Sequence, residues 1–289
     1  MIRIMDNDIK DARNYLNKAD AIFITSGAGM SVDSGLPDYR SNTGIIAQLN
    51  DKKYSYYELS HPKAFLENAE YSWGWYSKHI QEFLNAKPHR GYELLREFID
   101  KKNLDYFIFT SNVDCMWKRS NFSEDRIIEY HGSLDYMQSL SKDGPVWKMD
   151  IDEIKNIQYN KDTYKCVKST IPVSKVDGRY ARPNVCFFED GDYFNTSRFE
   201  KVDKYFSKWY MNIAKENKRL VVIEIGAGTI VPTVREMSEM LINEHLLRLN
   251  TDNNEYAKLI RINPSERDVP DGHINIPLSG LKALKLLLA

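Results

Sequence analysis

The sequence predicts an α/β fold: a doubly wound, mostly parallel sheet with a smaller domain formed by insertions. Apolar runs of strand length alternate along the chain with longer helix-like patterns, as they do when helices connect parallel strands. The runs are almost continuously apolar, which is typical of strands covered on both faces. Glycines and polar residues directly follow several runs, at the sheet edge where such folds bind ligands.

The period of the apolar residues places the individual elements. Strands are expected at 21–26, 106–111, 127–130, 184–188, 219–225 and 258–263. Helices are expected at about 7–18, 62–86, 90–102, 197–217, 233–249 and 279–288. The tail from residue 271 predicts a short strand and a turn before the last of these helices.

Two stretches do not fit a simple alternation. The first and second strands are separated by about 80 residues, too many for one crossover helix, which predicts an inserted helical module over 41–95. Residues 134–182 are polar with little periodicity, which indicates a second small insertion. The sheet domain is then expected to consist of 1–40, 96–133 and 183–289.

Composition excludes several classes of protein. The chain has 289 residues, and its 40 basic and 41 acidic residues give a net charge of -1, so no overall field favours nucleic acid or an anionic membrane. No run approaches the roughly 20 apolar residues of a membrane span, and the first residues carry charges where a secretory signal needs an apolar region. We therefore expect a cytoplasmic protein without direct nucleic-acid binding; the oligomeric state is left open.

The three cysteines are Cys115, Cys166 and Cys186. They are widely separated and form no C-x-x-C pair, so neither a metal knuckle nor a disulfide scaffold is indicated. We expect three reduced and mostly buried thiols.

The first strand runs into the sequence GAGMSVDSGLPDYR. Gly27, Ala28 and Gly29 follow the strand and precede a helix start, the context of a phosphate-binding loop. The next glycine is Gly35, so the spacing departs from G-x-G-x-x-G and a simple tight turn remains an alternative. The stretch ends in a carboxylate, an aromatic ring and a guanidinium, from Asp38, Tyr39 and Arg40. A loop that only binds phosphate does not need these groups.

The second and third strands are followed by TSNVD and YHGS. Asn112 can donate to and accept from a carboxamide or a ribose hydroxyl, and Asp114 can accept from an amide. An Asx turn or helix cap explains the same residues. His131 follows a strand and precedes a glycine, which suits a general base near neutral pH, although a purely structural histidine is the alternative.

Later strands end in similar sequences. Gly226, Gly228 and Thr229 form a second glycine loop, and Asn263 ends another strand. Each is also explained by an ordinary turn. Their joint occurrence at successive strand ends favours a dinucleotide laid across the sheet edge.

Taken in order, GAGMSVDSGLPDYR, TSNVD, YHGS, RPNV followed by FFED, GAGTIVPTVR and RIN resemble the sirtuin family of NAD-dependent protein deacylases, its bacterial branch above all. The resemblance covers about residues 20 to 285. It implies a Rossmann-like NAD domain and a smaller domain made from the two insertions, with NAD and an acyl-lysine protein or peptide meeting in the cleft between them.

The resemblance also implies residue roles. His131 would be the general base, while Asn112 and Asp114 would orient the ribose and the nicotinamide carboxamide. Contacts to NAD would come from Gly27, Ala28, Gly29, Asp38, Tyr39, Arg40, Ser111, Asn112, Asp114, Gly226, Gly228, Thr229 and Asn263. A substrate peptide would add as a strand beside Val185, Phe187, Phe188 and Glu189.

The implied activity is NAD-dependent deacylation of protein lysine, with release of nicotinamide and O-acyl-ADP-ribose. Two alternatives stay open. A sirtuin-like protein can use the same cleavage of NAD as a mono-ADP-ribosyltransferase or NAD hydrolase, or it can bind NAD as a non-catalytic sensor.

The chain departs from the family in two regions. Where the family usually has Phe-Gly, this chain has Phe187-Phe188-Glu189-Asp190, and a side chain in place of glycine would crowd a substrate strand. The family's two cysteine pairs are missing: Ser139 and Ser174 stand near two of the expected positions, and only Cys166 lies in the interval. One thiolate cannot make a tetrahedral site, so we expect a degenerate zinc-ribbon-like module without zinc. Its packing is expected from Tyr136, Trp147, Tyr159 and Tyr164.

Overall fold

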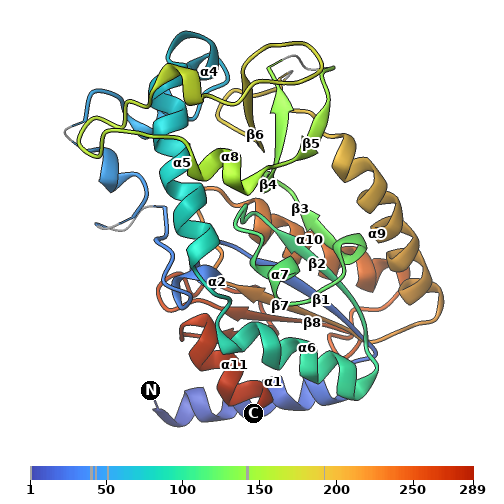
Figure 1. Cartoon of the computed structure of the whole chain (residues 1–289). Coiled ribbons are helices and arrows are strands. Elements are labelled where there is room, and N and C mark those ends of the chain that lie inside the picture. The colour runs from blue at the N-terminus through green and yellow to red at the C-terminus, as the bar shows by residue number, and fades with distance from the viewer. Residues whose placement is uncertain (1, 40–41, 43, 51, 141–142, 192) are drawn as a thin grey trace.

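The chain folds around two sheets of unequal size. The computed structural model describes residues 2–39, 42, 44–50, 52–140, 143–191 and 193–289. A six-stranded sheet forms the larger layer, and a three-stranded sheet belongs to a smaller module that lies above it in Figure 1.

The larger sheet is parallel throughout. Its strands are β1 (Ala21–Ser26), β2 (Asp105–Thr110), β3 (Ile127–Glu129), β7 (Leu220–Ile225), β8 (Ala257–Ile262) and β9 (Ile274–Ile276). They lie in the order β3-β2-β1-β7-β8-β9, and every neighbouring pair is parallel. Counted along the chain within this sheet, the order is the 3-2-1-4-5-6 arrangement of the Rossmann fold. The point where the order reverses lies between β1 and β7.

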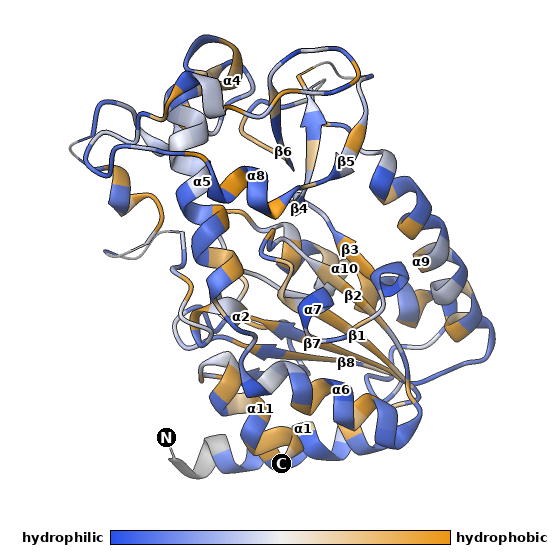
Figure 2. Ribbon diagram, viewed as in Figure 1, coloured by the Kyte–Doolittle hydropathy of each residue, from blue (hydrophilic) through white to orange (hydrophobic). Residues whose placement is uncertain are grey.

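Helices cover both faces of this sheet. On one face lie α1 (Ile2–Lys18), α6 (Arg90–Lys102) and α11 (Gly280–Leu288); on the other lie α9 (Ser197–Lys215) and α10 (Thr233–Arg248). Side chains alternate along each strand, so Ile22 and Ile24 join one hydrophobic cluster and Ala21 and Phe23 the other. Figure 2 shows the central strands as the hydrophobic part of this layer. No helix in the described part of the chain has the length and apolar character that a membrane span requires.

The smaller module contains the second sheet and several short helices. Its strands are β4 (Gly132–Ser139), β5 (Val146–Lys148) and β6 (Ala181–Val185), paired antiparallel in the order β5-β4-β6. Its helices are α3 (Tyr56–Leu59), α4 (Ala64–Glu67), α5 (Ala69–Asn85) and α8 (Ile151–Lys155). Two further short helices follow strands of the large sheet: α2 (Gly29–Val32) and α7 (Met116–Arg119).

The two insertions contact each other through α5. A Cβ on Gly74 would lie 1.8 Å from the carbonyl oxygen of Tyr164, so only glycine allows the two segments to approach this closely. The N–H of Cys166 donates to the Glu70 carbonyl at 2.9 Å, and the rings of Trp75 and Tyr164 lie 5.0 Å apart. The helical and polar insertions are therefore packed into one module.

Most predicted elements are confirmed, and two need correction. The strand at 21–26 and the helix at 90–102 occur with the expected bounds. The helix expected at 62–86 is wrong as a single element, because Asn68 leaves helical geometry (φ -130°, ψ 34°) and separates α4 from α5. The strand expected at 184–188 does not join the parallel sheet: β6 begins at Ala181 and pairs antiparallel with β4.

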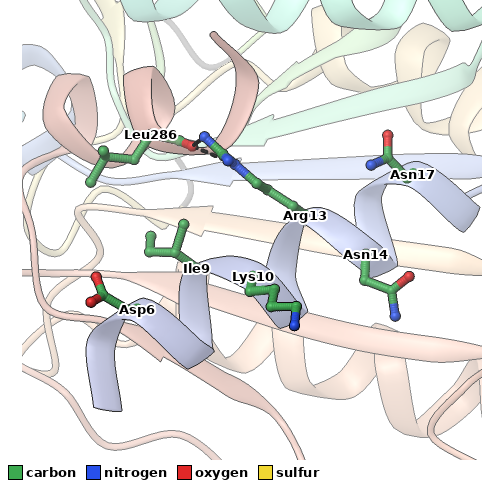
Figure 3. A pocket seen from close by; sticks show the side chains of 7 residues that line it. All are labelled: Asp6, Ile9, Lys10, Arg13, Asn14, Asn17 and Leu286. Carbon is green, nitrogen blue, oxygen red and sulfur yellow. Dashed lines mark hydrogen bonds between the residues drawn. The ribbon is translucent and has the colours of Figure 1, made fainter. Parts of the chain in front are cut away.

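A shallow groove of about 470 Å³ lies along α1. Figure 3 shows its lining, in which Arg13 Nε donates to the Leu286 carbonyl of α11 at 2.7 Å. The residues lining the groove include none of the candidate site residues.

The two glycine loops touch backbone to backbone at the point where the strand order reverses. A Cβ on Gly27 would lie 2.6 Å from the Gly226 carbonyl oxygen, and one on Gly29 would lie 2.7 Å from Gly226 Cα. Gly226 itself has φ of 64° and would bring a Cβ within 2.4 Å of the Gly29 carbonyl carbon. These glycines are required by the contact between the loops, whatever they bind.

We predict that Gly226→Ala destabilises the protein by more than ~2 kcal/mol, because the substitution adds both steric overlap and left-handed backbone strain. Gly228→Ala is the matched control in the same loop, since its Cβ would meet only Glu266 Oε1 at an ordinary 3.8 Å. Denaturant unfolding of both variants checks the prediction; equal free energies of unfolding would contradict it.

Candidate active site

The candidate residues lie where strands of the parallel sheet end. Because all these strands point the same way, the segments after β1, β2, β3, β7 and β8 meet at one edge. In the first loop, the N–H groups of Gly27 and Gly29 donate to the carbonyls of Ile225 and Gly226, each at 3.0 Å. The Ala28 N–H has no hydrogen-bond partner among the described residues and is therefore the donor of this loop that is left for a ligand.

Asn112 and Asp114 are joined through a buried serine. Asn112 Nδ2 donates to the Gly27 carbonyl at 2.9 Å and to Ser31 Oγ at 3.2 Å. Ser31 Oγ in turn donates to Asp114 Oδ2, and the Met116 N–H donates to Oδ1 at 3.0 Å. The loop after β2 is thus tied to the loop after β1, and the carbonyl oxygen of the Asn112 side chain is left for a ligand in the described part of the site.

Ser31 is a site residue that the sequence analysis missed. It is 3% exposed and lies within 3.3 Å of the Tyr92 hydroxyl of α6. Burial raises the pKa of Asp114, which the bonds from Ser31 and the Met116 N–H oppose. A hydroxyl two residues after Gly29 was the available signal, but only the fold shows that it meets a carboxylate 83 positions away.

His131 lies two residues after the end of β3 and is half-buried. Burial lowers the pKa of its imidazole, which favours the neutral form that a base requires. Its ring lies 5.3 Å from that of Tyr130 and makes no hydrogen bond within the described residues. Gly132 follows with φ of 86°, and a Cβ there would lie 2.1 Å from the Asn184 carbonyl oxygen. The glycine therefore lets β4 begin directly against β6 and fixes the backbone beside His131.

The loop carrying Asn112 and Asp114 is bonded to the strand that begins beside His131. The Leu134 N–H donates to the Val113 carbonyl at 3.0 Å, and Cys115 Sγ lies 3.2 Å from Ser133 Oγ. The structure therefore brings the segments of Asn112, Asp114 and His131 side by side.

A nearly buried ion network surrounds the histidine's backbone. Lys118 Nζ of α7 lies 3.1 Å from Glu129 Oε1, 3.0 Å from Asp135 Oδ2 and 3.0 Å from Ser133 Oγ. Arg198 of α9 adds a bond to Glu129 at 3.0 Å. Burial acts to lower the pKa of Lys118, but the two carboxylates outweigh it and raise the pKa, so the amine stays charged. Lys118 thus ties β3 to β4 on both sides of the histidine.

Asp38 and Tyr39 begin a closed loop, and Arg40 lies outside the described residues. The Ile45 N–H donates to the Asp38 carbonyl at 2.8 Å and the Ile46 N–H to the Tyr39 carbonyl at 3.1 Å. The Tyr39 ring lies 6.0 Å from that of Tyr56, and burial raises the pKa of its hydroxyl.

The loops after β7 and β8 form the other half of the edge. Asn263 is buried and braces them: its Nδ2 donates to the Ala227 carbonyl at 2.8 Å, and its Oδ1 accepts from the Glu266 N–H at 3.0 Å. Gly228 and Thr229 are exposed. Thr229 thus offers its hydroxyl at the surface, whereas the Asn263 amide is already engaged within the protein.

The segment expected to bind substrate is held by a buried ion pair. Arg182 Nη1 lies 2.6 Å from Asp190 Oδ1, and the two side chains are 1% and 0% exposed. Arg182 also donates to the Val185 carbonyl at 2.6 Å and lies 4.1 Å from the centre of the Phe187 ring. Glu189 has φ of 55°, a conformation that glycine adopts at lower cost. Within the stretch that stands where the resemblance expects Phe-Gly, Glu189 therefore occupies a left-handed position.

Three consecutive N–H groups of this segment are already engaged. The Cys186 N–H donates to the His131 carbonyl at 2.9 Å, and the Phe188 N–H donates to the Ser60 carbonyl at 3.0 Å. Between them, the Phe187 N–H donates to the buried carboxylate of the ion pair at 2.8 Å. A peptide strand placed here could not use these donors.

Hydrogen bonds join the two serines that stand near the expected cysteine positions. Ser139 Oγ donates to Asp177 Oδ2, and Ser174 Oγ accepts from the Asp177 N–H at 3.4 Å. Asp177 Oδ1 also accepts from the Arg179 N–H at 3.1 Å. Among the residues that the structure describes, no group of three or more His, Cys, Asp or Glu side chains is placed to hold a metal.

The aromatic residues of this module have different environments. Tyr164 belongs to the larger hydrophobic cluster, and Trp147 and Tyr159 pack against that cluster. Tyr136 instead lies against cations, with Arg198 3.6 Å and Lys148 5.0 Å from its ring centre. All three cysteines are free, as expected, with Cys115 and Cys166 buried and Cys186 half-buried.

Comparison with known proteins identifies the family. The model of the Sir2 family matches residues 27–222, which include the first glycine loop, the Asn112 loop and His131. The chain belongs to the Sir2 family. The sirtuin resemblance predicted from the motifs is thereby confirmed.

Relatives and solved structures extend the comparison over almost the whole chain. An NAD-dependent protein deacylase of Deinococcus radiodurans is 26% identical over 288 residues, covering 97% of this chain and 98% of the relative. A "Probable bifunctional ADP-ribose hydrolase/ADP-ribosyltransferase" of Fusarium oxysporum f. sp. cubense is 26% identical over 77% of this chain and 38% of its own length. The crystal structure of a Sir2 homologue with NAD has a TM-score of 0.65 at 20% identity, covering 96% of this chain and 92% of that one, which supports the Sir2 fold.

We predict that Lys118→Met lowers the free energy of unfolding by about 3 kcal/mol, because it removes a buried cation shared by two carboxylates, which keep only the more exposed Arg198 and Lys148. Lys118→Arg keeps a cation and should lose much less. Lys201→Met removes an exposed pair with Asp125 at 3.5 Å and should cost no more than ~1 kcal/mol. Equal losses in the Lys118→Met and Lys201→Met variants, measured by denaturant unfolding, would contradict the role of the network.

Proposed function

We propose that the protein is an NAD-dependent protein-lysine deacylase that releases nicotinamide and O-acyl-ADP-ribose. The observation that carries the proposal is the direct bonding of the Asn112–Asp114 loop to β4 beside His131, at the ligand-binding edge of a Rossmann-ordered sheet. A base beside the binding edge is needed for chemistry and not for binding alone. The deacylase names of the curated Sir2 relatives support the same reaction.

The residues at this edge fit NAD. Ala28 offers a free backbone N–H beside a helix start, and Asn112 offers a side-chain oxygen next to it. Gly228 and Thr229 are exposed on the neighbouring loop, where a dinucleotide crossing the sheet would reach them. NAD, when bound, would supply the ribose–nicotinamide bond. Cleavage of that bond would allow the acyl group to pass from lysine to ADP-ribose. Further contacts are proposed from Gly27, Gly29, Asp38, Tyr39, Arg40, Ser111, Asp114, Gly226 and Asn263.

His131 is proposed as the general base that takes a proton from a ribose hydroxyl. Its lowered pKa keeps the ring neutral at physiological pH, and its ring nitrogens have no partner within the described residues that would compete for that proton. Asn112 and Asp114 are proposed to orient the ribose and the carboxamide, with Ser31 holding both side chains in place.

The substrate is proposed to be an acyl-lysine protein or peptide bound beside Val185, Phe187, Phe188 and Glu189. We keep the proposed division into an NAD domain (1–40, 96–133 and 183–289) and two inserted modules (41–95 and 134–182), although α6 runs unbroken through residue 95. We further propose that the protein is cytoplasmic and does not bind nucleic acid directly.

A second candidate is a mono-ADP-ribosyltransferase or NAD hydrolase. It is favoured by the engaged N–H groups of Cys186, Phe187 and Phe188, which limit the pairing of a substrate strand. The name of the Fusarium relative points to the same chemistry. It stands second because the Fusarium relative is matched over 38% of its length, whereas the Deinococcus deacylase is matched over 98%.

We propose that the smaller module holds no structural zinc. Asp177 links the segments of Ser139 and Ser174 by hydrogen bonds at the place where the resemblance puts metal-binding cysteines. These bonds and the packing of Tyr164 against α5 supply the cross-links that a metal would otherwise provide.

Purified protein should release nicotinamide in amounts matched to the acyl peptide that it deacylates. The test incubates the protein with NAD and a mixed acyl-lysine peptide library and follows nicotinamide, O-acyl-ADP-ribose and ADP-ribosylated protein by mass spectrometry. Nicotinamide release that ignores added peptide would favour the second candidate. No consumption of NAD would indicate a non-catalytic NAD sensor.

His131→Ala should bind NAD with nearly unchanged affinity but turn over at least ~100-fold more slowly, since general bases contribute roughly 10²–10⁴ in rate. In the wild type, kcat/KM should fall on acidification with a midpoint below 6.5, because burial lowers the pKa of the base and only its neutral form accepts the proton. Turnover of His131→Ala at the wild-type rate would show that another group is the base.

Metal analysis of the purified protein should find far less than one zinc per chain, and a chelator should leave the melting temperature unchanged. Asp177→Ala should lower that temperature, since it removes the acceptor of the Ser139 and Arg179 bonds. About one zinc per chain would refute the proposal.

A further inference from the structure

A shallow, open cavity of about 570 Å³ lies beside the proposed substrate segment. It is formed by α3, α4, the chain around them, and the Phe188-Glu189 pair. Its lining residues are Tyr54, Tyr57, Glu58, His61, Lys63, Ala64, Glu67, Asn68, Phe188 and Glu189. The cavity therefore joins the helical insertion to the segment that departs from the family pattern.

The cavity is close to the candidate base along the chain. Cys186 donates to the His131 carbonyl, and Phe188 follows two residues later, so the Cα atoms of these two residues are at most about 7 Å apart. A lysine presented at His131 would bring the side chains a few residues from it within reach of the cavity. Because the N–H groups of Cys186, Phe187 and Phe188 are engaged, recognition here must depend on side chains more than on a strand ladder.

Exposed aromatic rings form one part of the wall. Tyr57 and Phe188 are 46% and 39% exposed, and their ring centres lie 4.7 Å apart. Aromatic faces of this kind attract cations. Tyr54, which also lines the cavity, already makes such a contact. Lys53 Nζ lies 4.9 Å from the ring centre of Tyr54 and 4.8 Å from that of Tyr71.

The charges around the cavity are mostly negative. Three carboxylates line it, against one lysine and one histidine: Glu58, Glu67, Glu189, Lys63 and His61. Glu58 is engaged in the capping box of α3, in which it exchanges hydrogen bonds with Ser55. His61 Nε2 lies 3.4 Å from Glu189 Oε2. The Glu189 side chain is nevertheless 86% exposed, so it remains available to a ligand.

We propose that this cavity is a specificity site that binds an arginine or lysine side chain of the substrate protein, near its acyl-lysine. The assignment depends on the proposed deacylase function. The side chain's aliphatic part would lie against Tyr57 and Phe188, and its charge would face Glu67 and Glu189. The protein should therefore select acylated lysines that have a basic neighbour.

The test compares matched acyl-lysine peptides that differ only in carrying Arg, Gln or Glu at positions flanking the lysine. Two quantities are measured: kcat/KM with NAD, and the peptide dissociation constant by fluorescence anisotropy without turnover. We expect the Arg peptide to exceed the Gln peptide by about fivefold in both, the size that exposed charge and cation–π contacts together provide. The Glu peptide should be the poorest.

The double variant Glu67→Gln/Glu189→Gln should reduce the Arg-to-Gln ratio to about one, and Tyr57→Leu should reduce it in part. The matched control is Glu200→Gln/Asp203→Asn, which makes the same change of charge on exposed residues of α9 and should leave the ratio unchanged. Unchanged melting temperatures would show that each variant is folded.

The outcomes separate this proposal from the deacylase function. Deacylation with no preference for a basic neighbour, or a preference that survives in the double variant, would overturn the specificity site and leave the function standing. Selective binding of the Arg peptide that is lost in the double variant, without deacylation of any peptide, would support the site and overturn the function.

Discussion

The contact between the two glycine loops is the constraint on which the rest of the site depends. Gly27 and Gly29 meet Gly226 backbone to backbone, so β1 and β7 can lie adjacent with both of their loops at the same edge. This closeness uses two of the donors that a phosphate loop offers and leaves the N–H of Ala28. These glycines are therefore required for the packing of the two loops, whatever ligand the loops bind.

Near that contact, the candidate base is held through its backbone, and Asn112 and Asp114 are held through a serine that both of them contact. The His131 ring makes no hydrogen bond within the described residues, yet its backbone is held by Cys186 and by the Lys118 network on either side. Asn112 and Asp114 are likewise aligned through Ser31. The ring nitrogens of the candidate base consequently stay available to a substrate proton, while the surrounding charges are satisfied within the protein.

The pattern of apolar residues predicted the parallel sheet and most helices, because buried strands form continuous apolar runs and half-buried helices repeat their apolar residues at the helical period. It could not distinguish the run at 184–188 from a parallel core strand, since a buried antiparallel strand is equally apolar. Nor could it detect the break at Asn68, whose side chain accepts a hydrogen bond from Tyr54 at 2.9 Å. At the site, the strand-end residues were visible as motifs, whereas Ser31 and Lys118 were not. Their roles depend on partners that only the folded chain brings near.

The fit of Gly74 against Tyr164 bears on how this architecture can be varied. Two segments separated by about 90 positions share a contact that admits no side chain on one partner, and Cys166 adds a backbone bond across the same junction. The two insertions are therefore not interchangeable parts. A chimera that imports residues 134–182 from a relative would have to import the matching surface of α5 as well, so new substrate preferences are more readily grafted as a pair of insertions than one at a time.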